Sequence, residues 1–207
     1  MKIKNQIWFP VLYIFILTLV LSSILILFGL FTRKRVEDNT RIALERSVLE
    51  VLPIDLADKI PTNQVHQLYT KLIRDPDASS GKAFRYIEAD SLIAYILPVQ
   101  GPGFWAAIKG VIGIAVDQKT VTGISFYEQN ETPGLGGEIV SQTFRRQFVG
   151  KKLGAGKAPL EIRMPAEPID ENSVHAVTGA TQTSMRLSKF LNEALLTWQR
   201  AVTEKGE

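Results

Sequence analysis

The feature that most constrains this chain is a run of residues near its start without a charged side chain. Residues 5–32 contain no Asp, Glu, Lys or Arg, and residues 7–31 are almost continuously apolar. A helix over 7–31 would be roughly 37 Å long, enough to cross a bilayer core of roughly 30 Å. The run is longer than a signal-peptide core, and the flank around Gly29 offers no small-residue cleavage site. We therefore predict an uncleaved single-span membrane anchor, residues 1–35.

The charges beside this span do not by themselves orient it. Lys2 and Lys4 precede it, while Arg33, Lys34 and Arg35 follow it, so the positive-inside rule is nearly balanced. Taken alone, the Arg-Lys-Arg cluster would slightly favour a cytoplasmic C-terminal domain. No ionisable side chain lies within the span, so this helix by itself is not expected to carry an ion across.

Composition bounds the rest of the chain. With 207 residues there is room for one globular domain and an accessory segment. The net charge of +3 is too small to indicate a nucleic-acid partner. The chain has no cysteine, which excludes disulfides, thiolate zinc sites and an iron–sulfur cluster held by this chain alone.

Hydrophobic periodicity beyond the span predicts an α+β fold, with a helical connector (36–80) and a domain (81–207) of antiparallel strands flanked by helices. Short strands joined by tight turns favour antiparallel pairing over βαβ crossovers. The predicted elements are helices 36–52 and 61–74, a turn segment 75–81, a hairpin of 83–88 with 91–99 turning at Ala89-Asp90, a hairpin of 108–116 with 120–127 turning at 117–119, a helix 138–148, a strand 160–164, a polar loop 165–173 and a final amphipathic helix.

Two nucleotide-binding motifs are rejected. Residues 101–106 fit the relaxed dinucleotide pattern G-x-G-x-x-A, but a strand is expected after them where the Rossmann turn requires a helix. No P-loop is present: after Gly150, Ala155 stands where the second glycine would be, and Lys157 is followed by Ala158 in place of Ser or Thr.

The most informative stretch is Thr178-Gly179-Ala180-Thr181-Gln182-Thr183-Ser184, which concentrates four hydroxyl side chains just before an amphipathic segment. A turn that opens a helix offers free N–H groups and the positive end of the helix dipole, both of which favour a phosphate. The alternative is that Thr181, Thr183 or Ser184 only caps the helix.

A second cluster, Glu131-Thr132-Pro133-Gly134-Leu135-Gly136, follows the predicted sheet. Pro133-Gly134 suits the two central positions of a type II turn. Its glycines would allow a flat ligand to approach the backbone closely. The alternative is a plain strand-to-helix turn.

Both clusters resemble hallmarks of one family. Residues 178–184 resemble the S/T-G-A-T-x-T-S signature, and residues 131–136 the E-T-P-G-L-G block, of covalent-FMN subunits in two respiratory complexes. These are NqrC of the sodium-pumping NADH:quinone oxidoreductase and RnfG of the Rnf complex. Local features around residues 103–105, 127–129 and 150–152 look closer to NqrC. The family usually has Asp where this chain has His175, which we read as a polar loop residue or, alternatively, a metal ligand or base.

The resemblance implies roles for individual residues. Thr183 would carry FMN through a phosphoester bond, and Thr178, Gly179, Ala180 and Thr181 would hold the loop or the phosphate. The residues expected beside the isoalloxazine ring are Glu131, Thr132, Leu135, Gly136 and, by stacking, Trp105. No catalytic or metal-binding residue is implied, and the alternative for Trp105 is a core aromatic.

The interpretation is an electron-transfer flavoprotein subunit of a membrane-bound translocase that pumps sodium or protons, with NADH, ferredoxin or a quinone such as ubiquinone as end partners. The resemblance places the single-pass protein in the inner membrane with its domain on the periplasmic face. Its expected partners are other Nqr or Rnf membrane subunits, a flavin transferase and the lipid bilayer, with no nucleic acid. The alternatives are an RnfG protein, a stand-alone flavin reductase or sensor, and a non-redox membrane-tethered scaffold.

Overall fold

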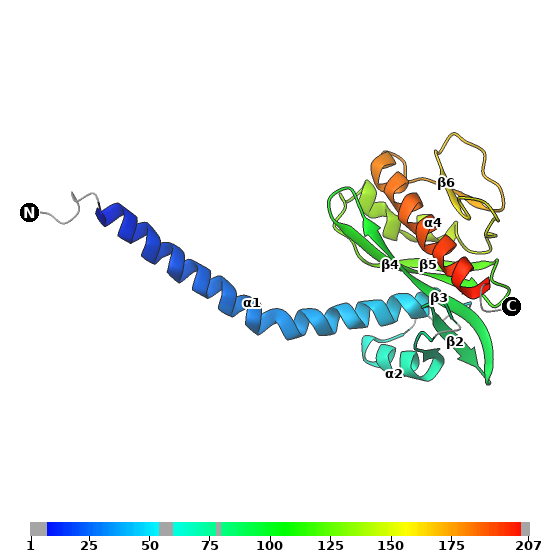
Figure 1. Ribbon diagram of the computed structural model, residues 1–207, viewed down its shortest axis with the longest axis horizontal. Helices are drawn as coiled ribbons and strands as arrows, with labels where there is room; N and C mark the ends of the chain where they lie inside the picture. The colour runs from blue at the N-terminus through cyan, green and yellow to red at the C-terminus, as the bar shows by residue number, and fades with distance from the viewer. Residues whose placement is uncertain (1–7, 54–59, 78–79, 204–207) are drawn as a thin grey trace, which may run out of the picture. The chain divides into compact units, whose positions relative to one another are not determined.

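The computed structural model describes residues 8–53, 60–77 and 80–203, and the chain divides into two compact units at residues 41 and 42 (Figure 1). The first unit is the start of α1 (Trp8–Glu50), whose side chains up to Phe31 are almost all exposed. Within the described ranges, α1 is the one helix long and apolar enough to cross a membrane. Lys2, Lys4 and Ile7 lie outside the described residues, as does part of the predicted turn segment 75–81.

Helix α1 continues to Glu50, so the span and the first connector helix, which the sequence pattern separated, are one element. Residues 32–50 contain neither Gly nor Pro, and nothing there interrupts the helix. The last turns of α1 belong to the second unit, where Val48 and Leu49 are buried. The boundaries at residues 35 and 80 stay predictions.

The second unit is built on a five-stranded antiparallel meander, with strand order β1-β2-β3-β4-β5. Its strands are β1 (Ile73–Arg74), β2 (Phe84–Glu88), β3 (Ser91–Pro102), β4 (Ala107–Ala115) and β5 (Val121–Glu128). Both predicted hairpins are confirmed. Ala89 and Asp90 have φ of 47° and 62°, and Gln118 has φ of 59°, the left-handed values of tight hairpin turns. The α+β prediction is therefore correct.

The rejected dinucleotide pattern is a further hairpin turn. Pro102 of β3 pairs with Ala107 of β4, and the Gly103 N–H donates to the Ala106 carbonyl at 2.7 Å. Strand β4 follows this turn directly, so there is no helix N-terminus here to receive a pyrophosphate.

Apolar side chains cover both faces of the sheet, because successive strand residues point to opposite sides. Tyr95, Leu97 and Val99 of β3 join the core beneath α4 (Thr181–Thr203), with Leu187, Leu191 and Trp198 of that helix. Ala94 and Ile96 face the end of α1 and α2 (Thr62–Leu72). The meander is thus the middle layer, with α4 on one side in Figure 1.

The helix expected over 138–148 is split, and this prediction needs correction. A 3₁₀ helix η3 (Gly136–Val140) ends at Ser141, and α3 (Gln142–Arg146) starts there. Ser141 has extended ψ of 146°, and its hydroxyl accepts the Phe144 N–H. This N-cap bond interrupts the helix, yet Phe144 and Phe148 are buried as expected.

A small parallel pair, β6 (Glu161–Arg163) with β7 (Ser173–His175), lies next to α4. The sequence predicted β6 but took residues up to 173 as loop. Asn192 of α4 fixes this region, since its side chain accepts the Leu160 N–H at 2.9 Å and donates to the Leu160 carbonyl at 2.8 Å.

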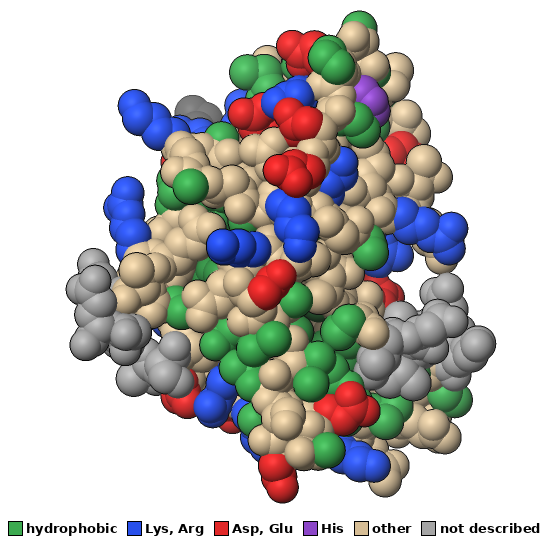
Figure 2. Space-filling view, turned by 90° about the vertical axis from the view of Figure 1, so that its right-hand side faces the viewer, with side chains coloured by type: hydrophobic (Ala, Val, Ile, Leu, Met, Phe, Trp, Pro, Cys, Tyr) green, Lys and Arg blue, Asp and Glu red, His purple; other side chains and the backbone are tan. Residues whose placement is uncertain are grey.

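On the face shown in Figure 2, basic and acidic side chains are interspersed.

Candidate functional site

The hydroxyl-rich stretch lies where the sequence placed it, at the start of a helix. Gly179 has φ of 76° in the turn before α4, and α4 begins at Thr181. The Val177 N–H donates to the Ser184 hydroxyl at 3.2 Å, which ties the loop to the first helical turn. The first N–H groups of a helix have no intrahelical partner, so this end of α4 is suited to an anion.

Thr183 does not use its hydroxyl to cap the helix. Its Oγ1 donates to Glu131 Oε2 at 2.6 Å, and both side chains are almost fully buried, with residue exposures of 4% and 5%. The other oxygen, Glu131 Oε1, accepts the Phe104 N–H at 2.9 Å and the Trp105 N–H at 3.0 Å. The two signature clusters are thus joined through one carboxylate.

Two glycines make room for this carboxylate and its hydroxyl partner. A Cβ at residue 103 would lie 2.5 Å from Glu131 Oε1. A Cβ at residue 136 would lie 2.5 Å from Thr183 Oγ1 and 2.9 Å from Glu131 Oε2. Such contacts are far inside van der Waals distance, so only a residue without Cβ allows the observed packing.

An apolar rim, made of Phe104, Trp105 and Leu135, is exposed next to this pair. Trp105 is 69% exposed and donates its Nε1–H to the Thr132 hydroxyl at 3.1 Å. Phe104 packs edge to face on Trp105, and the Arg186 guanidinium lies 5.9 Å from its ring centroid. Leu135 is 44% exposed and lies closely against Gly179. A flat apolar ligand could cover these side chains.

The structure brings together most of the residues that the motifs singled out. Thr183, Glu131 and Gly136 form one contact group, while Trp105 joins Thr132 and Leu135 meets Gly179. Thr178 is exposed on the loop, Thr181 is exposed at the start of α4, and Ala180 is buried. The roles of these residues toward a cofactor stay predictions.

Sequence reasoning missed Gly103, Phe104 and Arg186. Phe104 and Gly103 stand next to Trp105 in the chain, and Arg186 is one helical turn beyond Thr183. Those spacings were the available signals. No signal in the sequence placed Glu131 in the interior, because the residues that hydrogen-bond its carboxylate lie 26 to 52 positions away.

His175 binds the Gln147 side chain through its backbone. Its N–H donates to Gln147 Oε1 at 2.9 Å, and the Gln147 amide donates to its carbonyl at 3.4 Å. The Nδ1 atom is buried without a hydrogen-bond partner in the described structure. Within those same ranges, no three His, Cys, Asp or Glu side chains cluster to hold a metal ion.

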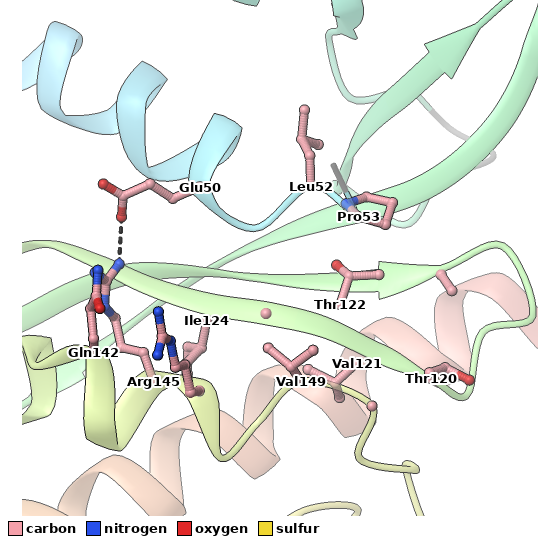
Figure 3. A pocket seen from close by; sticks show the side chains of 14 residues that line it. Glu50, Leu52, Pro53, Thr120, Val121, Thr122, Ile124, Gln142, Arg145 and Val149 are labelled. Carbon is pink, nitrogen blue, oxygen red and sulfur yellow. Dashed lines mark hydrogen bonds and ion pairs between the residues drawn. The ribbon is translucent and has the colours of Figure 1, made fainter. Parts of the chain in front are cut away.

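A hollow of about 700 Å³ lies elsewhere, between the end of α1, β5 and α3 (Figure 3). The Glu50–Arg145 ion pair lies at one end of it, beside Gln142. It is lined by none of the motif residues, so its size alone does not make it the functional site.

Residues 103–196 match the family described as the FMN-binding domain. Over this segment the chain is similar to FMN-binding domains. Both signature clusters and the apolar rim lie inside it.

Several curated relatives share one name. The chain is 40% identical over 110 residues to the C subunit of the Na(+)-translocating NADH-quinone reductase of Vibrio vulnificus (strain YJ016), covering 52% of this chain and 43% of that protein. It is 46% identical over 91 residues to the equally named protein of Neisseria meningitidis serogroup A, covering 43% and 35%. These matches span less than half of the relatives' length. The resemblance to NqrC is confirmed.

A solved structure shares the fold. The crystal structure of the Na(+)-translocating NADH-quinone reductase C protein from Parabacteroides distasonis aligns with a TM-score of 0.69 and 22% identity, over 83% of this chain and 95% of that one. At 22% identity this similarity supports a shared fold and nothing more.

Proposed function

We propose that this chain is a membrane-anchored electron-transfer subunit that carries FMN esterified to Thr183. The observation that supports this most is the Thr183 hydroxyl at the start of α4, held by Glu131 within the FMN-binding domain. The relatives' shared name favours NqrC of a sodium-translocating NADH:quinone reductase over an Rnf protein or a scaffold. Complex membership, ion transport and the other membrane subunits are parts of the same proposal.

The residues present fit FMN. The free N–H groups of α4 would meet the phosphate, with Thr178, Gly179, Ala180 and Thr181 shaping the loop. Gly136 places no Cβ against the Thr183 oxygen, where one would clash at 2.5 Å. The apolar rim, with Thr132 beside Trp105, would cover the ring and exclude water from it.

Bound FMN supplies the redox chemistry, accepting and releasing electrons. The chain's own part is to hold the ring at the surface, where a redox partner can approach. Trp105 and Phe104 offer it an apolar face, and the Arg186 cation nearby would favour a ring that gains negative charge.

The domain would face the periplasm, because a covalent tether is most useful where no free FMN replaces a lost cofactor. The bilayer would hold the apolar part of α1, and a flavin transferase would install the cofactor. No pool of diffusible flavin is then needed during turnover.

The test is the intact mass of the full chain, purified in detergent from its native host, with the modified peptide located. We expect one FMN phosphoester on Thr183 and none in Thr183→Ala. Thr181→Ala, which removes an exposed hydroxyl of this helical turn, tests the alternative acceptor and should still carry FMN on Thr183. A bare polypeptide mass for the native chain, or FMN on Thr181, would refute the proposal.

A further inference from the structure

We propose that Glu131 is the general base that removes the Thr183 proton when the flavin phosphate is attached. This inference rests on the proposed function, because it concerns the formation of the same ester. Glu131 Oε2 accepts the Thr183 hydroxyl at 2.6 Å, within the reach that proton transfer requires. The acceptor residue thus carries its own base.

Hydrogen bonds fix the Glu131 carboxylate in the orientation that a general base for Thr183 needs. Oε1 is fixed by the N–H groups of Phe104 and Trp105, which leaves Oε2 directed at the hydroxyl. Glu131 is 5% exposed, so bulk water has little access to the pair. A side chain fixed by two backbone donors needs little reorganisation when the proton moves.

An alcohol is a weak nucleophile unless a neighbouring base takes its proton. Thr183 is itself 4% exposed, and Glu131 already occupies the position of its proton acceptor. A base supplied by a transferase would have to displace this buried carboxylate. The geometry therefore assigns the step to the chain itself.

The reaction balances with a flavin dinucleotide, in which the FMN phosphate is joined to a second nucleotide by a phosphoanhydride. Thr183 Oγ1 forms a bond to the FMN phosphorus as its proton passes to Glu131 Oε2. The anhydride P–O bond breaks, and its electron pair leaves on the oxygen of the departing nucleoside monophosphate. Glu131 then releases the proton to that phosphate or to water, and no electron is gained or lost.

The experiment uses the full chain in detergent, made without flavin transferase and then given FAD, Mg²⁺ and purified transferase. The rate of mass gain is measured from pH 6 to pH 9 for the wild type, Glu131→Gln, Glu131→Asp and Glu138→Gln. Glu138 is an exposed carboxylate of η3, seven residues further along the chain, and serves as the matched control. The Gln variant keeps an oxygen for the two N–H donors, and thermal unfolding checks its fold.

Loss of a positioned base typically costs 10²- to 10⁴-fold, so we expect Glu131→Gln to be modified at least about 100-fold more slowly at pH 7. Its rate relative to wild type should rise about tenfold per pH unit, since hydroxide must replace the carboxylate. Glu131→Asp keeps a base, so it should be modified more slowly than wild type, and the ratio of the two rates should stay constant from pH 6 to pH 9. Glu138→Gln should match the wild type.

Two results would overturn the inference: a Gln variant modified as fast as wild type, or one slowed by the same factor at every pH. The latter would mean that Glu131 only supports the fold. An Asp variant whose ratio rises with pH would also overturn it. If the wild-type chain itself gains no mass, the proposed function has failed, which is a different outcome.

Discussion

Gly136→Ala should separate the flavin attachment site from the rest of the fold. A Cβ at this position would lie 2.5 Å from Thr183 Oγ1, whereas ordinary contacts begin at 3.4 Å. The hydroxyl would therefore have to move by roughly 0.9 Å, and Glu131 with it, since its Oε2 would lie 2.9 Å from the same Cβ. A displacement of about 1 Å in a reacting group can cost about 100-fold in rate.

We therefore expect Gly136→Ala to be modified with FMN about 100-fold more slowly than the wild type. Overpacking of this kind should also lower the free energy of unfolding by about 1–3 kcal/mol. The assay is the time course of intact mass with FAD, Mg²⁺ and transferase, beside thermal unfolding of the detergent-solubilised chain.

Gly134→Ala is the matched control. A Cβ there meets nothing within 4 Å, but the φ of 73° is strained for alanine. It should lose about 1–2 kcal/mol of stability yet be modified at nearly the wild-type rate. The reasoning is refuted if Gly136→Ala reacts as fast as wild type, or if Gly134→Ala is slowed equally.

Three further predictions test stability, pH dependence and topology. Asn192→Ala should lower the free energy of unfolding by about 2–4 kcal/mol, because the buried N–H and carbonyl of Leu160 lose their partner; a loss below about 1 kcal/mol would contradict this. Hydrogen bonds from the Thr120 hydroxyl and N–H lower the pKa of Asp117 from 3.8 to about 2. The contribution of Asp117 to the stability of the folded state is therefore complete above pH 4 and is lost as the pH falls toward 2. Asp117→Asn should accordingly be less stable than wild type at pH 7 and nearly equal at pH 2, measured by urea unfolding; an equal difference at both pH values would argue against it. Lys157→Cys, a single exposed cysteine in an otherwise cysteine-free chain, should react with a membrane-impermeant maleimide in intact spheroplasts; labelling only after lysis would place the domain in the cytoplasm.

Local sequence signals predicted the elements whose geometry is itself local. The hairpin turns at Ala89-Asp90 and around Gln118 follow from turn chemistry between alternating strands. The buried face of α4 follows from helical spacing of residues such as Leu187 and Leu191. Each of these needs only neighbours within a few positions.

Elements that depend on distant partners were predicted less well. The strand β7 forms because it lies beside β6, and a three-residue strand has too little alternation to be visible alone. Ser141 ends one helix and starts the next through a single side-chain bond. The hydrophobic pattern over residues 138–148 does not reveal this break at Ser141.

The sequence by itself determined that a long apolar helix begins this chain, that an antiparallel meander follows, and that a hydroxyl-rich turn opens the last helix. These depend on periodicity and on motifs a few residues long. Only the tertiary structure decided which atom the Thr183 hydroxyl meets. Glu131 reaches it across 52 residues, while a hairpin turn 26 and 27 residues earlier fixes the other carboxylate oxygen. Such a junction arises when the sheet and α4 pack together, because packing, and no local pattern, sets the distances between segments that far apart.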